Sequence, residues 1–182
     1  MTSDLIVVLD GGREVSFSFA AMLSYHGGGS PGGVAHAFKV LERALPLLNP
    51  AGLVERRQIL VKTAFGGPGA RDAFELVTRA VSDQRFILAP SLARPELGRA
   101  RERFVFRLHY GDRAITLTLR EGFVTDAFID LARREGRTAQ EEDRLAVMKA
   151  EMAARVMSAV AAQVYDVEPA RWPNGVSRGQ FQ

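Results

Sequence analysis

The residues best suited to chemistry in this chain are a histidine and a serine within a run of glycines. Residues 25–33 read Tyr-His-Gly-Gly-Gly-Ser-Pro-Gly-Gly, so six of the nine are glycine or proline. Glycine lets the backbone approach a ligand closely, and Ser30 followed by Pro31 is typical of a helix N-cap and first helical residue. The segment therefore predicts His26 beside a loop that ends on a helix N-terminus, where free N–H groups favour anions. A tight turn between two helices would explain the same residues without a ligand.

Part of this loop also matches a hydrolase motif. The run Gly28–Gly32 fits the G-x-S-x-G nucleophile elbow and overlaps an HGGG run. In α/β-hydrolases the residue after the serine donates its N–H to the oxyanion, and Pro31 has no N–H. The residues therefore argue against that fold. A hydrolytic arrangement of Ser30 with His26 and Asp72 on another fold stays open, because triads are defined by geometry.

Metal chemistry is restricted by composition. The chain has no cysteine, which excludes disulfides, thiolate zinc sites and cysteine nucleophiles. The other two histidines, His36 and His109, follow the first at spacings of 10 and 73 residues, and these spacings do not indicate a zinc site. A packed or surface position is the simpler interpretation of both. An oxygen-rich site that combines His26 with Ser30 and Asp72 stays open.

Helices and a strand must position these residues. Apolar residues at helical spacing predict a helix over 34–48, which Asn49 and Pro50 end. Residues 57–65 predict a strand, and a second glycine turn at 66–69 leads into a helix over 70–81. Asp72 is then either a site residue or a first-turn acid that complements the helix dipole.

The second half of the chain predicts a hairpin followed by two helices. Residues 103–110 and 113–120 alternate apolar and polar types around Gly111 and Asp112. A helix over about 126–134 precedes a long one, which opens with a capping box at 138–141 and continues to about Tyr165.

At the N-terminus, residues 5–19 fit a hairpin, and residues from about 18 to 25 fit a short helix, which we favour. Together these elements predict an α+β fold, with an antiparallel or mixed sheet and helices packed on it. Residues 1–167 are expected to form a single domain and residues 168–182 a mobile C-terminal tail.

The order of these motifs resembles the FmdE-like family, named after a component of formylmethanofuran dehydrogenase, over roughly residues 18–125. That family has an aromatic residue and a His-Gly-His-x-Cys-Pro-Gly motif leading into a long helix, then Cys-x-x-Asp-Ala at a helix start, Thr-Gly-Cys-Thr, and a Gly-Lys step into a β-hairpin. The corresponding segments here are Tyr25–Gly32, Gly69–Ala73, Thr78–Val81 and Gly98–Arg99.

The chain departs from the family pattern at the soft ligands. Gly28 replaces the second histidine, and Ser30, Gly69 and Ala80 replace the cysteines. Family members place a metal at this site, so the resemblance leaves His26 as the one matched ligand. Tight zinc is not expected, and a weaker divalent metal stays open. The C-terminal zinc-binding extension of some members is not expected here, and the activity of the namesake enzyme is not carried over.

Composition restricts the partners and the location. The formal net charge is only +3, and arginines alternate with acids, which predicts a mixed solvated surface rather than a nucleic-acid platform. No run of 18 apolar residues occurs, so no membrane span is predicted. The N-terminus lacks the basic start of a secretory signal. We expect a cytoplasmic protein with neither a nucleic-acid nor a membrane partner.

We expect this protein to bind a small polar or anionic molecule at the glycine loop and the start of the 70–81 helix. Whether the protein is an enzyme is left undecided. The alternatives are a non-catalytic interaction protein that lost the family metal site and a hydrolase that uses Ser30 and His26. Methionines and other apolar residues on the last helix also predict a homodimer. The expected ligand-binding residues are Tyr25, His26, Gly27, Gly28, Gly29, Ser30, Gly32 and Asp72.

Overall fold

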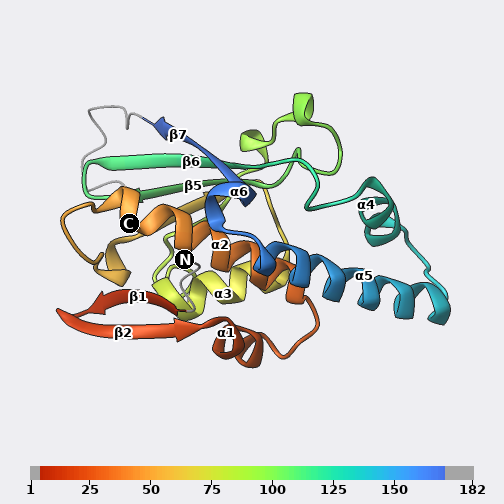
Figure 1. The fold of residues 1–182 in the computed structure, drawn as a ribbon, viewed down its shortest axis with the longest axis horizontal. Coiled ribbons are helices and arrows are strands. Elements are labelled where there is room, and N and C mark those ends of the chain that lie inside the picture. Colours follow the sequence, from red (N-terminus) through yellow and green to blue (C-terminus); the bar gives the residue numbers. More distant parts are fainter. Residues whose placement is uncertain (1–4, 171–182) are drawn as a thin grey trace.

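The computed structural model describes residues 5–170, which form an α+β fold with one five-stranded mixed sheet, one separate hairpin and six α-helices. Helix α2 runs between the large sheet and the hairpin (Figure 1). The strands are β1 (Leu5–Asp10), β2 (Arg13–Ser18), β3 (Leu60–Thr63), β4 (Phe86–Leu88), β5 (Val105–Tyr110), β6 (Arg113–Leu119) and β7 (Tyr165–Ala170). The helices are α1 (Phe19–His26), α2 (Pro31–Leu48), α3 (Pro68–Thr78), α4 (Asp126–Arg133), α5 (Ala139–Ser158) and α6 (Ala161–Val164).

The large sheet has the strand order β4-β3-β5-β6-β7. β3 is antiparallel to β5 and parallel to the short β4, so the sheet is mixed. The hairpin of β5 and β6 is confirmed, with Tyr110 opposite Arg113 and Gly111 at a φ of +61° in the turn. This sheet carries α2 on one face, as the apolar alternation of β5 and β6 requires.

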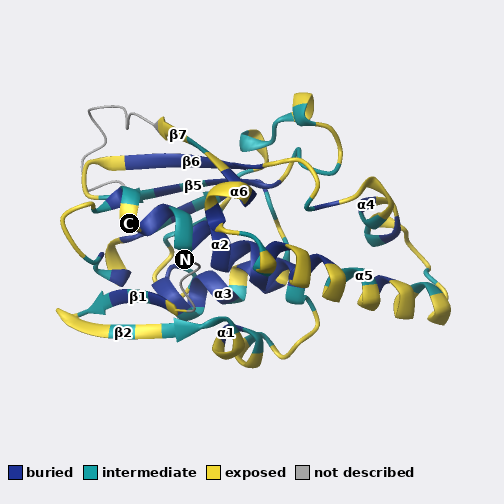
Figure 2. Cartoon of the chain, viewed as in Figure 1, coloured by how far each residue is buried: buried dark blue, intermediate teal, exposed yellow. Residues whose placement is uncertain are grey.

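Helix α2 forms the centre of the core. Thirteen of its eighteen residues are buried, because the helix contacts the sheet, α3 and α5 at once. Figure 2 shows most of it as buried, whereas α5 is exposed along its outer side. A helix that is buried nearly all round cannot place charge freely, and buried Lys39 is accordingly paired with Glu42 at 2.7 Å.

The N-terminal segment contains both of the elements that its sequence allows. β1 and β2 pair over six residues each, and α1 follows without a gap. Ser18 caps α1, with its Oγ accepting a hydrogen bond from the Ala21 N–H at 3.1 Å. The favoured helix therefore exists, but it is preceded by a hairpin rather than replacing it.

The end of the chain differs from the sequence-based prediction. The last helix was expected to reach about Tyr165, but α5 ends at Ser158, and Ala159 and Val160 have extended backbone. The chain turns back after α5, so that β7 pairs with β6 and Tyr165 is completely buried in the core. Residues 168–170, expected in the tail, belong to β7. The rest of the expected tail, 171–182, lies outside the described residues.

Helix α3 begins and ends earlier than its sequence pattern indicates. It starts at Pro68 and ends at Thr78, because Arg79 adopts a left-handed conformation with a φ of 55°. Arg56 fixes this end by donating hydrogen bonds to the carbonyl oxygens of Val77 and Leu76 at 2.8 and 2.5 Å. The predicted strand over 57–65 is likewise shorter, since residues 56–58 form a 3-10 turn before β3.

Candidate functional site

The glycine loop connects the end of α1 to the start of α2. Gly27 and Gly28 have φ values of +84° and +83°, which L side chains rarely adopt, so these two glycines make the turn. Ser30 occupies the N-cap position and Pro31 the first helical position, as expected. The Ser30 side chain, however, makes no capping hydrogen bond within the described residues, so Ser30 holds this position through its backbone alone.

Three further glycines allow close helix packing at this point. A Cβ on Gly69 would lie 2.3 Å from the Ser30 carbonyl oxygen, and one on Gly33 would lie 3.0 Å from the Ala70 nitrogen. On the other side, a Cβ on Gly32 would lie 2.8 Å from the sulfur of Met152 in α5. The glycines therefore let the start of α2 fit between α3 and α5, which gives them a structural role apart from any ligand.

His26 is paired with Asp72. Its Nδ1 lies 2.8 Å from Asp72 Oδ2, and the His26 side chain is 8% exposed. Asp72 lies beyond the first turn of α3, which starts at Pro68, so it is not the dipole-complementing acid that the alternative proposed. An ionised carboxylate only accepts hydrogen bonds, so Nδ1 is the donor in this pair, and in the neutral imidazole Nε2 would be the acceptor. That Nε2 is buried and has no hydrogen-bond partner within residues 5–170.

The other histidines lie elsewhere. His36 is fully buried in α2, and its Nδ1 lies 2.8 Å from the Tyr165 hydroxyl. Its ring also contacts the ring of Phe104, with the centroids 4.7 Å apart. Burial lowers its pKa from 6.5 to about 3, so the ring is neutral. The pKa of His109 in β5 is also lowered, mainly by burial.

The remaining donors do not fit the metal centre that the family resemblance implies. No cluster of three or more His, Asp or Glu residues that could hold an ion occurs in the described part of the chain. His26 and Asp72 are bonded to each other. Gly69, at a matched cysteine position, has no side-chain atom that could bind an ion, and a Cβ there would lie 2.3 Å from the Ser30 carbonyl oxygen. A closed site needs four ligands as a rule, and this site offers two.

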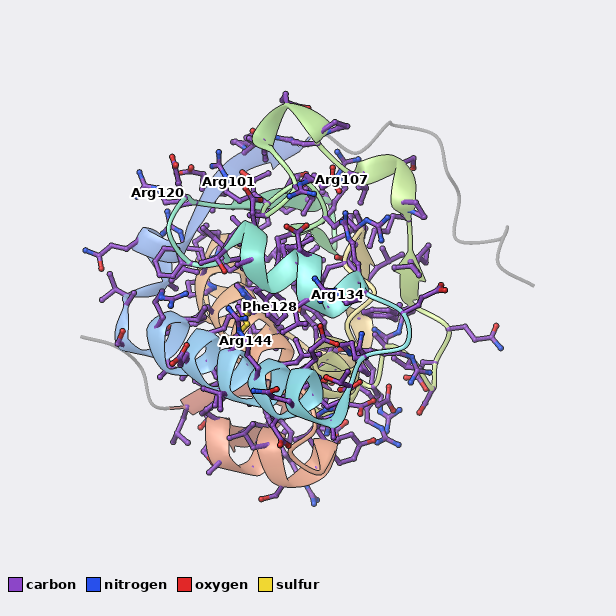
Figure 3. The ribbon with its side chains drawn as sticks, turned by 90° about the vertical axis from the view of Figure 1, so that its right-hand side faces the viewer. Arg101, Arg107, Arg120, Phe128, Arg134 and Arg144 are labelled. Atoms are coloured by element: carbon purple, nitrogen blue, oxygen red, sulfur yellow. The ribbon has the colours of Figure 1, made fainter. Side chains whose placement is uncertain are left out.

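A cavity of about 370 Å³ lies on the other side of the loop. The starts of α2 and α3 form one wall, α4 and α5 form another, and the segment before β5 forms a third. Figure 3 looks onto this side of the molecule, with Phe128 between α4 and α5 and Arg134 and Arg144 nearby. The lining residues are Ser30, Gly32, Gly33, Phe65, Gly67, Pro68, Arg99, Arg103, Phe104, Phe128, Ile129, Ala132, Arg133, Arg137, Leu145, Lys149 and Met152.

The charge of this lining is entirely positive. Five of the lining residues are arginine or lysine, and the described lining includes neither aspartate nor glutamate. Three of the arginines are ion-paired with carboxylates outside the cavity, at N–O distances of 2.7–2.9 Å: Arg99 with Asp130, Arg133 with Glu102, and Arg137 with Glu142.

Two cations of the lining are not neutralised in this way. The Lys149 ammonium donates to the carbonyl oxygen of Gly29 at 3.1 Å, and exposed Arg103 forms no side-chain ion pair with residues 5–170. The first hydrogen bond of α2 runs from the Val34 N–H to the Ser30 carbonyl oxygen, so the N–H groups of Gly32 and Gly33 precede the helical ladder. The lining therefore combines two N–H groups from the first turn of α2 with two cations that no carboxylate of residues 5–170 neutralises.

The structure separates the expected site residues into two groups. His26 and Asp72 meet each other, but neither lines the cavity. Ser30 and Gly32 do line it, while Tyr25 is 49% exposed at the end of α1. Sequence reasoning missed the cavity cations and the aromatic wall, because they come from segments far from the glycine loop in the chain. Residues 99–103 contain three arginines and one acid, Glu102, and this local excess of positive charge was too weak a signal to predict the cavity cations.

The sequence matches no protein-family model and no curated protein. Within the described part of the chain, no helix is long and apolar enough to cross a membrane.

Proposed function

We propose that this protein binds a small anionic molecule in the cavity where the starts of α2 and α3 meet. The observation that carries the proposal is the composition of the lining, with five cations and no carboxylate among its described residues. The first-turn N–H groups of Gly32 and Gly33 add donors at the same wall. A concave site with a few convergent polar groups is the usual form of a small-molecule site.

The test is NMR titration with acetate and with inorganic phosphate, which detects weak binding. We expect saturable shifts of the backbone amide signals of Gly32 and Gly33. The double variant Arg103→Gln/Lys149→Gln should weaken both titrations about tenfold, the scale of a lost charged hydrogen bond. The control is Arg13→Gln, since Arg13 is exposed at the distant start of β2. Amide signals that do not saturate, or that respond equally in the double variant, would refute the proposal.

The resemblance to the FmdE-like family is part of this proposal. It is supported by the position of the aromatic–His–Gly segment before a long helix, and by the close packing of the two matched glycine turns at Ser30 and Gly69. The Asp72 that matches the family motif contacts the matched His26. The chain would then have kept the arrangement of the family site without its soft ligands. Cytoplasmic location remains a prediction from the cysteine-free sequence.

A hydrolase is the second candidate, favoured by one observation. Asp72 holds His26 in the tautomer that leaves Nε2 free to accept a proton, as in a catalytic triad. No hydrogen bond joins His26 to Ser30 in the described residues, and the cavity is lined by Ser30 alone of the three. Hydrolysis of p-nitrophenyl acetate that is lost in both Ser30→Ala and His26→Ala would support this candidate over simple binding.

We also propose a homodimer that buries the outer side of α5. Val147 on this side is 57% exposed, and Ala150 and Ala154 are exposed beside it. Such a two-fold contact would remove a large apolar side chain from water. Light scattering at micromolar concentration should give about twice the chain mass of 19.9 kDa. A mass of one chain would contradict the dimer and leave the binding proposal intact.

A further inference from the structure

We infer that the ligand of the cationic cavity is an amphipathic anion, a short apolar chain or single ring that ends in one carboxylate or phosphate. This inference rests on the proposed function and adds the class of ligand. Inorganic anions would use only the cations and the helix starts. The rest of the lining points to a ligand with an apolar body as well.

The inner walls of the cavity are apolar and firmly packed. Phe65 and Phe104 stack with ring centroids 4.4 Å apart and an interplanar angle of 25°, and Phe104 is only 2% exposed. Ile129 of α4 and Leu145 of α5 are 8% and 4% exposed on the facing walls. Phe128 is half-buried at the junction of these two helices (Figure 3). Phe65, like Phe128, is only half-buried. A hydrated ion would leave the exposed parts of these two rings in water, whereas an apolar body would cover them.

The cations lie beside the apolar surface rather than apart from it. On α5, Leu145, Lys149 and Met152 are spaced by four and three residues, so they share one helix face. The Lys149 ammonium is held at the loop by the Gly29 carbonyl oxygen at 3.1 Å. On the neighbouring segment, Arg103 directly precedes the buried Phe104. The α5 wall and the segment before β5 therefore each present a charge next to an apolar surface, which matches a ligand with an anionic head and an apolar body.

The size of the cavity limits the apolar body. Its volume of about 370 Å³ is near the lower end of the range for small-molecule sites, roughly 300–1,000 Å³. The cavity suits a chain of several carbons or one ring, and it is too small for a two-chain lipid. Carboxylate and phosphate heads both fit the cationic wall, so the test compares them.

The experiment is isothermal titration calorimetry with acetate, butyrate, hexanoate and octanoate, and with octyl phosphate and neutral 1-octanol. The dissociation constant should fall about fourfold for each added CH₂ until the cavity is filled. Octanol should bind at least about tenfold more weakly than octanoate, because it lacks the charge. Octyl phosphate binding more tightly than octanoate would identify a phosphate ester, and the reverse a carboxylic acid.

Variants assign these effects to the two parts of the cavity. Arg103→Gln/Lys149→Gln should weaken octanoate about tenfold and leave octanol unchanged. Phe128→Ala should reduce the gain per CH₂ and weaken octanoate far more than acetate, since Phe128 belongs to the apolar wall of the cavity. Arg13→Gln should match the unmodified protein in all titrations. Circular dichroism spectra establish that each variant is folded.

The outcomes separate this inference from the proposed function. Saturable acetate binding with no gain along the series would overturn the amphipathic class and leave anion binding standing. Octanol that binds as tightly as octanoate, together with no effect of the double charge variant, would overturn anion binding as well. A chain-length gain that Phe128→Ala does not reduce would place the apolar body outside this cavity and overturn the inference.

Discussion

Lowering the pH should destabilise this protein through His36. Burial holds the pKa of His36 at about 3, against its ordinary value of 6.5, so the folded protein keeps the ring neutral. The unfolded chain binds a proton there below pH 6.5 while the folded chain does not. The stabilising contribution of the neutral ring is therefore complete above pH 6.5 and is lost progressively as the pH falls toward 3.

The size of this effect follows from the span of the two pKa values. Each pH unit between them corresponds to about 1.4 kcal/mol of unfolding free energy. Going from pH 7 to pH 4.5 crosses about two of these units, so His36 alone should remove about 2–3 kcal/mol. That is a large share of the stability of about 5–15 kcal/mol that is typical of a domain. Carboxylates also titrate in this range, so the total loss is not diagnostic by itself.

The assay is urea unfolding at pH 7.0, 5.5 and 4.5 for the unmodified protein and for His36→Gln. Gln can still hydrogen-bond with Tyr165 but does not titrate, so the variant should lose about 2–3 kcal/mol less than the unmodified protein. The control His109→Gln should recover a smaller part, since the pKa of His109 is lowered in the same direction at a less buried position. Equal losses in the unmodified protein and His36→Gln would refute the reasoning. If His36→Gln does not fold, NMR titration of the unmodified protein decides, because a His36 ring that protonates above pH 5 contradicts a buried neutral histidine.

Three further predictions concern stability and metal content. Gly69→Ala places a Cβ 2.3 Å from the Ser30 carbonyl oxygen and should lower the free energy of unfolding in urea by about 1–3 kcal/mol or more. The control is Gly29→Ala, which has open space around it and should change the urea midpoint little. Arg56→Leu removes a donor from one buried and one part-buried carbonyl oxygen at the end of α3 and should destabilise by about 2–4 kcal/mol. The exposed neighbour Arg57→Leu is the control, and equal effects would contradict a special role of Arg56. Elemental analysis after chelator treatment should find less than about one zinc per chain, and stoichiometric zinc would show that the described donors are not the whole ligand set.

Local patterns in the sequence determined most of the elements near the candidate site. The apolar spacing of 34–48, the turn residues at 111 and 112, and the Thr138–Glu141 capping box each depend on neighbours within a few positions, and each is confirmed. The α+β class followed from the order of these elements. A glycine loop that ends on a helix start was equally visible, because Gly-Gly-Gly-Ser-Pro restricts the backbone locally.

Long-range packing decided the rest. Nothing in residues 139–165 breaks the helical pattern, and the helix ends at Ser158 because β7 gains a pairing partner in β6 and Tyr165 reaches His36, which is 129 residues away in the chain. The same holds for the site. The sequence predicted that the loop and His26 would form one ligand-binding site. In the structure, α3 packs against α1, and His26 is paired with Asp72 instead. The cavity lies on the opposite side of the loop, where α4, α5 and Arg103 converge. Local propensities act within a few residues, whereas a cavity is the space left between elements, so its position and charge arise only when the whole chain is packed.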